Sequence, residues 1–240
     1  MTAGALRIPA PPPRHWAAEP ARSIAGIVSL VGARRALLAG PKGDGRTIVI
    51  LPGLFNGDSA MFPMRRYLTW LGYRAEGWGL GANFGARTIG SEGERLFERL
   101  ETLAAETGPV TLIGVSLGGM IARLAAHRRP DLVREVVTIA APYAGDPRAT
   151  NVWRLFEWMT GERIDGAAVQ VRLREIARPL PVPATAIWSA TDGIVNGLIC
   201  HAPGEANCRS VEVVSSHMGV QHRPEVLLRV AETLSTSSRT

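Results

Sequence analysis

The chain has 240 residues, of which 46% are hydrophobic and 20% charged. This is the profile of one packed globular domain and excludes a disordered chain. The net charge is +6, and seven basic residues against two acidic ones fall within residues 1–46. Elsewhere Arg alternates with Glu, which is typical of a solvated surface, so we expect no nucleic-acid partner. No apolar run reaches the length of a membrane span, and two cysteines cannot form a disulfide framework.

The N-terminal region divides into an arm and a helix. Clustered prolines predict an extended or disordered arm over residues 1–19, followed by a single domain over residues 20–240. Apolar residues recur at helical spacing over residues 20–39, which predicts a helix. We expect its apolar face to pack on the domain; the alternative is that it lies on an anionic membrane surface. That face consists of Ile24, Ile27, Val28, Val31 and Leu38.

After residue 45, short apolar runs alternate with longer amphipathic segments. This order predicts an α/β fold with a mostly parallel sheet of about six strands, covered by helices on both faces. The segment 141–183 interrupts the alternation with two expected helices. We expect it to form a lid over the carboxyl edge of the sheet, where ligands bind; the alternative is one ordinary crossover helix and a loop. The expected strands are 47–51, 74–78, 110–115, 133–140, 184–189 and 211–214, and the expected helices 61–71, 91–106, 117–128, 149–160, 166–177 and 224–234.

The strongest chemical pattern is Gly114-Val115-Ser116-Leu117-Gly118. An apolar strand runs directly into it and a helix runs directly out of it. Strand, sharp turn and helix is the geometry of a nucleophile elbow, in which glycines permit the turn and the Ser hydroxyl is exposed. A Gly-rich turn with an incidental Ser is the alternative. We predict that Ser116 is a nucleophile.

A Ser nucleophile needs a general base, and the base needs an acid that orients it. Asp192 and His217 follow the last two predicted strands, so both are expected at the same edge of the sheet as Ser116. They are the predicted acid and base, with Asp146 and His222 as the alternatives. His222 directly precedes the last helix, where a capping or surface role is expected.

A tetrahedral oxyanion needs two converging N–H donors. One is expected from Leu117, the residue after the nucleophile, and the other from Leu54 in Leu51-Pro52-Gly53-Leu54-Phe55. Gly53 allows the backbone to turn so that the next amide points inward. An ordinary Pro-Gly turn is the alternative.

Together these motifs resemble the α/β-hydrolase superfamily, specifically its small lipase- and esterase-like members, over about residues 45–235. The resemblance implies hydrolysis of carboxylic esters, including lipid esters, through an acyl-enzyme, without a metal or cofactor. Pro52 stands where many such families have a His, and their N-terminal antiparallel strands are not evident here. Substrate contacts are expected from Phe55 and from Trp153, Phe156 or Trp158 in the lid segment.

Two other functions compete with ester hydrolysis. An acyltransferase or perhydrolase would use the same Ser, Asp and His with a different acceptor. A non-catalytic binding protein on the same scaffold would need none of the three groups, so their presence argues against it. The sequence does not specify the natural substrate, its acyl-chain length or the oligomeric state.

Several weaker patterns carry no function. The Gly-rich run 77–85 fits no dinucleotide fingerprint and opens no helix, so we expect a loop beside the acyl pocket. Cys200 and Cys208 lack the close pairing of a structural zinc site. A disulfide between them is expected only in an exported protein. No secretory leader is readable, so we expect free thiols and a cytoplasmic location.

Overall fold

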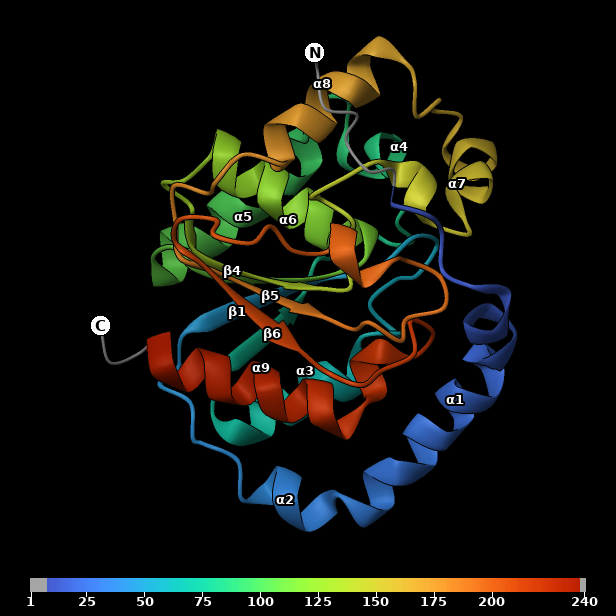
Figure 1. Ribbon diagram of the computed structural model, residues 1–240. Coiled ribbons are helices and arrows are strands. Elements are labelled where there is room, and N and C mark those ends of the chain that lie inside the picture. Colours follow the sequence, from blue (N-terminus) through green and yellow to red (C-terminus); the bar gives the residue numbers. More distant parts are fainter. Residues whose placement is uncertain (1–7, 238–240) are drawn as a thin grey trace.

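A computed structural model describes residues 8–237. Within these residues, one sheet of six parallel strands has the order β2-β1-β3-β4-β5-β6 (Figure 1). The expected α/β class with a mostly parallel sheet flanked by helices is confirmed. The strands are β1 (Thr47–Leu51), β2 (Arg74–Gly77), β3 (Val110–Val115), β4 (Val133–Ile139), β5 (Ala184–Trp188) and β6 (Cys208–Glu212).

Helices cover both faces of this sheet. The described helices are α1 (Pro13–Gly32), α2 (Arg34–Leu38), α3 (Phe62–Leu71), α4 (Ala86–Ile89), α5 (Glu94–Thr107), α6 (Leu117–Arg128), α7 (Trp153–Thr160), α8 (Ala167–Ile176) and α9 (Pro224–Ser237). Helices α3 and α9 lie on one face, and α5 and α6 lie on the other (Figure 1). None of the helices within residues 8–237 combines the length and the hydropathy needed to cross a bilayer.

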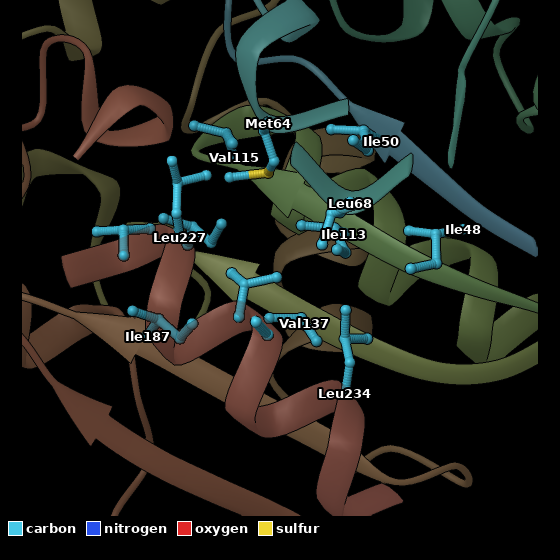
Figure 2. Packing of buried hydrophobic residues seen from close by; sticks show 14 of the residues in the cluster. Ile48, Ile50, Met64, Leu68, Ile113, Val115, Val137, Ile187, Leu227 and Leu234 are labelled. Atoms are coloured by element: carbon cyan, nitrogen blue, oxygen red, sulfur yellow. The ribbon is translucent and has the colours of Figure 1, made fainter. Parts of the chain in front are cut away.

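Two apolar cores result from this layering. The central strands β1 and β3 are buried on both faces, so their sequences are continuous apolar runs. Figure 2 shows one core, in which Met64 and Leu68 of α3 and Leu227 and Leu234 of α9 pack on the strands. The other core packs α5 and α6 on the opposite face of the same strands. The sheet is therefore packed on both faces, and its carboxyl edge is supported by both cores.

The N-terminal helix differs from the expectation in its start and its end. Helix α1 begins at Pro13, because proline at the first helical position lacks only an N–H that would have no partner there. It continues through Pro20, within the stretch expected to be an arm, and ends at Gly32. A separate short helix, α2, follows. The expectation of one helix over residues 20–39 was therefore wrong at both ends.

The expected orientation of this helix was also wrong. Ile24, Val28 and Val31 are 64%, 66% and 80% exposed, so the apolar face points away from the domain. The opposite face contacts the domain through small and polar residues, among them Glu19 and Gly26. A Cβ at Gly26 would lie 2.6 Å from the Arg223 side chain, so a larger residue there would have to displace that arginine.

Most other boundaries agree with the predicted pattern to within a few residues. The last strand is displaced toward the N-terminus, covering Cys208–Glu212 instead of residues 211–214. It is an edge strand whose side chains are mostly exposed, so it has no continuous apolar run to mark it. The segment 141–183 contains α7 and α8, which lie beyond α6 near the carboxyl edge (Figure 1).

Candidate active site

Ser116 stands at the junction of β3 and α6, in a sharp turn one residue long. Its φ of 51° and ψ of −118° place a non-glycine residue in a strained backbone region. A Cβ at Gly118 would collide with the Leu51 and Pro52 carbonyl oxygens, and one at Gly114 would collide with the start of α6. The two glycines of the motif are therefore required for the close approach of backbone to backbone.

A hydrogen-bond chain joins Ser116, His217 and Asp192. Nε2 of His217 lies 3.1 Å from Oγ of Ser116, and Nδ1 lies 2.7 Å from Oδ2 of Asp192. The carboxylate only accepts hydrogen bonds, so Nδ1–H donates to Asp192 and Nε2 accepts from the Ser116 hydroxyl. This arrangement of nucleophile, base and orienting acid is the one that activates a serine.

The Asp192 carboxylate is fixed by its own turn, residues 189–195. Its Oδ1 accepts the N–H groups of Ile194 and Val195, both at 2.8 Å. The side chain is almost fully buried. Since one oxygen is held by these two amides, the other is directed at His217.

A second buried carboxylate, Glu19 of α1, connects the turns that carry the acid and the base. Its Oε1 accepts the N–H groups of Gly193 at 2.8 Å and of His217 at 3.0 Å. Its Oε2 accepts the N–H of Met218 at 2.7 Å. Glu19 is only 1% exposed, and Arg22, one turn further along α1, donates to the same Asp192 turn. Helix α1 thus fastens the Asp192 turn to the His217 turn, defined as residues 213–219.

No sequence pattern predicted this role of Glu19, because the residue fell within the expected arm. The available signal was that Glu19 is the only acidic residue before Asp44. An isolated acid in a basic segment says nothing of its hydrogen-bond donors, since all three of these lie more than 170 residues later in the chain.

The environment of His217 shifts its pKa. Burial lowers the pKa, but the charge and hydrogen bond of Asp192 and the charge of Glu19 raise it by more. The net result is a pKa above the ordinary value of 6.5. Both nearby carboxylates therefore favour the imidazolium that forms when His217 accepts a proton.

The buried amide of Asn83 ties the loop after β1 to the Gly-rich run 77–85. Asn83 is fully buried and donates from Nδ2 to the Pro52 carbonyl at 2.6 Å. Its backbone carbonyl accepts the Phe55 N–H at 2.7 Å. Leu54 and Leu117 border the same cavity as Ser116. Within residues 8–237, no acceptor takes a hydrogen bond from the N–H of Leu54 or Leu117. The Gly-rich run 77–85, expected to be only a loop, thus supplies the residue that braces the loop after β1.

A mostly apolar cavity of about 90 Å³ adjoins Ser116, and a second of about 70 Å³ continues from it between α6 and the segment 141–183. Trp153 and Phe156 line the first cavity from α7. The shared walls of the two cavities are Leu117, Met120, Phe156, Val169 and Leu173.

Two predicted substrate contacts do not line these cavities. Trp158 is 79% exposed, because its position on α7 points it away from the face that carries Trp153 and Phe156. Phe55 lies within the loop after β1, where its side chain is 53% exposed.

The alternative acid and base lie apart from this hydrogen-bond chain. Asp146 accepts the N–H of Arg148 in a short turn, and Nε2 of His222 lies 3.2 Å from the Ala60 carbonyl. Cys200 and Cys208 are free thiols, and burial raises the pKa of both. Within the described part of the chain, no three His, Cys, Asp or Glu side chains gather as metal ligands would.

Comparison with known proteins agrees with this architecture. A family described as the α/β hydrolase fold matches residues 96–195, which include the elbow and Asp192. No curated protein matches the sequence.

Solved structures give the same fold at low identity. One is MGS-MChE2, an α/β hydrolase enzyme from a lagoon-sediment metagenome of Mar Chica, Morocco. It is 20% identical, covers 83% of this chain and 94% of its own, and has a TM-score of 0.54. A structure described with LipS and LipT, two metagenome-derived lipolytic enzymes, is 13% identical. It covers 84% of this chain and 96% of its own, with a TM-score of 0.60. A bacterial membrane phospholipase A is 15% identical, covers 91% of this chain and 93% of its own, and has a TM-score of 0.57.

The chain therefore has the α/β-hydrolase fold, and enzymes described as lipolytic are among the proteins whose solved structures share it.

Proposed function

We propose that this protein is a serine hydrolase that cleaves carboxylic esters through an acyl-enzyme intermediate. The observation that carries the proposal is the hydrogen-bond chain from Asp192 through His217 to Ser116, with distances of 2.7 and 3.1 Å. Each member stands on a turn at the carboxyl edge of the sheet, and the Ser backbone is strained as in a nucleophile elbow. A neutral packing role would require neither the strain nor the aligned chain.

In the first half of the reaction, Oγ of Ser116 attacks the ester carbonyl carbon while Nε2 of His217 takes the hydroxyl proton. Asp192 holds the Nδ1–H tautomer and stabilises the imidazolium. The carbonyl oxygen becomes an oxyanion, which would accept the N–H groups of Leu54 and Leu117. The carbon–oxygen bond to the alcohol then breaks, and His217 returns the proton to the leaving alcohol.

In the second half, water replaces the alcohol. His217 takes a proton from water as its oxygen attacks the acyl carbon, and the same amides hold the second oxyanion. The ester bond to Ser116 then breaks, and His217 protonates Oγ as the acid leaves. Since the base must be neutral at the start, the raised pKa of His217 confines full activity to pH values above that pKa.

The cavities support an acyl chain of limited length. Together they are lined mostly by apolar side chains, with Glu162 and Arg172 in the wall of the second, and they lead from Ser116 between α6 and the segment 141–183. The first, of about 90 Å³, is smaller than the roughly 150 Å³ of a cavity that holds benzene. We expect short acyl chains to react fastest, with longer chains requiring the second cavity.

The test combines covalent labelling with turnover. A fluorophosphonate probe should form an adduct on Ser116, located by peptide mass spectrometry, since an activated serine attacks phosphorus as it attacks a carbonyl. Chromogenic esters of graded chain length should be hydrolysed, with Ser116→Ala as the control. An adduct on another residue, or equal turnover by the Ser116→Ala variant, would refute the proposal.

A further inference from the structure

Helix α1 is amphipathic, but its apolar side faces solvent and its polar side faces the protein, the reverse of an ordinary surface helix. We define its apolar face as Ile24, Ile27, Val28 and Val31, which follow each other at i, i+3, i+4 and i+7 and so form one stripe. Their exposed fractions are 64%, 49%, 66% and 80%. The polar and small residues of the helix face the protein instead. A monomeric soluble protein rarely leaves such a stripe uncovered.

The apolar face continues into a groove between the N-terminal helices and α3. Val31, Leu38, Phe62 and Trp70 line this groove and are all at least 39% exposed. In Figure 1, α1 and α2 form an outer margin of the molecule beside α3 and α9. The exposed apolar surface therefore spans three helices and is not confined to one side chain.

Basic side chains border this surface. They are Arg34 and Arg35 of α2, Lys42, and Arg65 and Arg66 of α3. No Asp or Glu occurs in residues 20–43 or 62–71, and in the described structure none of the five basic residues forms a salt bridge. Lys42 lies 3.8 Å from the Trp70 ring centroid, which keeps its ammonium beside the apolar groove.

We propose that this surface docks the protein on an anionic lipid membrane. Aliphatic side chains flanked by unpaired basic ones match a bilayer surface, where apolar groups enter the acyl boundary and Arg and Lys remain at the phosphates. A second copy of the chain fits poorly, since it would oppose the same positive charges. Single-stranded nucleic acid needs a row of stacking rings, whereas the α1 face has none and Trp70 of the groove lies under the Lys42 ammonium.

Docking in this way would bring the proposed active site to membrane-borne esters. The N-terminal half of α1 holds Glu19 against the Asp192 and His217 turns, and the apolar face follows directly along the same helix. Only this substrate class depends on the proposed function. The docking itself requires no turnover, so the two are tested separately.

The test is flotation of the full-length protein with vesicles of phosphatidylcholine alone or with 30% phosphatidylserine. We expect co-flotation with the anionic vesicles, reduced by high salt and by more than about tenfold in the Val28→Asp/Val31→Asp variant. The matched control is Val171→Asp on α8, where Val171 is also exposed, and it should float like the unaltered protein. Circular dichroism and hydrolysis of a soluble ester should be unchanged in both variants.

Three results would overturn the proposal. These are absence of the protein from the anionic vesicle fraction, flotation unaffected by Val28→Asp/Val31→Asp, and a dimer in light scattering that this variant dissociates. If docking holds and the substrate class is right, the same variant should lose hydrolysis of a vesicle-borne ester selectively. Failure of fluorophosphonate labelling would refute the catalytic proposal and leave the flotation result standing.

Discussion

Replacement of Glu19 by Gln separates a positioning role from a purely structural one. The Gln side chain keeps the shape of Glu, and its oxygen can still accept the backbone N–H groups of Gly193 and His217. Its NH₂ group then faces the Met218 N–H, so one charge-assisted bond is lost and a buried donor is left without an acceptor. We expect a loss of about 2–4 kcal/mol in the free energy of unfolding, as charge-assisted bonds and unsatisfied buried donors each contribute about 1–3 kcal/mol.

The same substitution should change the pH dependence of activity. The charge of Glu19 is among the causes that raise the pKa of His217, so its removal lowers that pKa. The acid limb of kcat/KM against pH should move to lower pH, because His217 loses its proton sooner. We also expect kcat to fall by about 10–100-fold, since small displacements of catalytic groups cost that much.

Glu135→Gln is the matched control. Glu135 is similarly buried, accepts from Thr111 at 3.1 Å and pairs with Arg46 at 3.0 Å, but it lies near the amino ends of the strands. It should lose comparable stability with no displacement of the acid limb. An unmoved acid limb in Glu19→Gln, with kcat intact, would show that Glu19 only stabilises the fold.

The remaining predictions concern the base, the loop after β1 and the cavity. His217→Ala should reduce kcat by at least about 10⁴-fold, whereas His222→Ala should retain most activity; equal losses would reassign the base. Asn83→Ala should lower kcat by up to about 10²-fold with little change in KM, as the brace of a predicted oxyanion donor is lost; an unchanged kcat would contradict this role. Phe156→Ala should shift preference toward longer acyl chains in a graded ester series, and the exposed Trp158→Ala should not. The unaltered enzyme should reach half its maximal kcat/KM above pH 6.5, the ordinary pKa from which that of His217 is raised.

Local patterns in the sequence predicted the sheet well, because β1 and β3 are buried on both faces and so are continuous apolar runs. The elbow around Ser116 was recognisable for a similar reason. Its strand, glycines and helix are adjacent in the chain, so one short window contains the whole geometry.

Features that depend on distant contacts were not predictable in this way. Helical periodicity identified the stripe on α1 but not which face contacts the domain, since either choice has the same spacing. Glu19 and Asn83 act on backbone groups, and backbone groups have no sequence signature. On α7, composition suggested three aromatic contacts, while helix geometry turns Trp158 outward.

The fastening of α1 has a consequence for how the chain acquires its structure. Glu19 is made early in synthesis, but its partner amides at His217 and Met218 lie 198 and 199 residues later. Closing so long a loop is unfavourable until the sheet exists, so these bonds are expected to form after the folding transition state. Substitution at Glu19 should then accelerate unfolding and leave refolding nearly unchanged. The contacts of helix α1 would then form late in folding and set how long the protein stays folded.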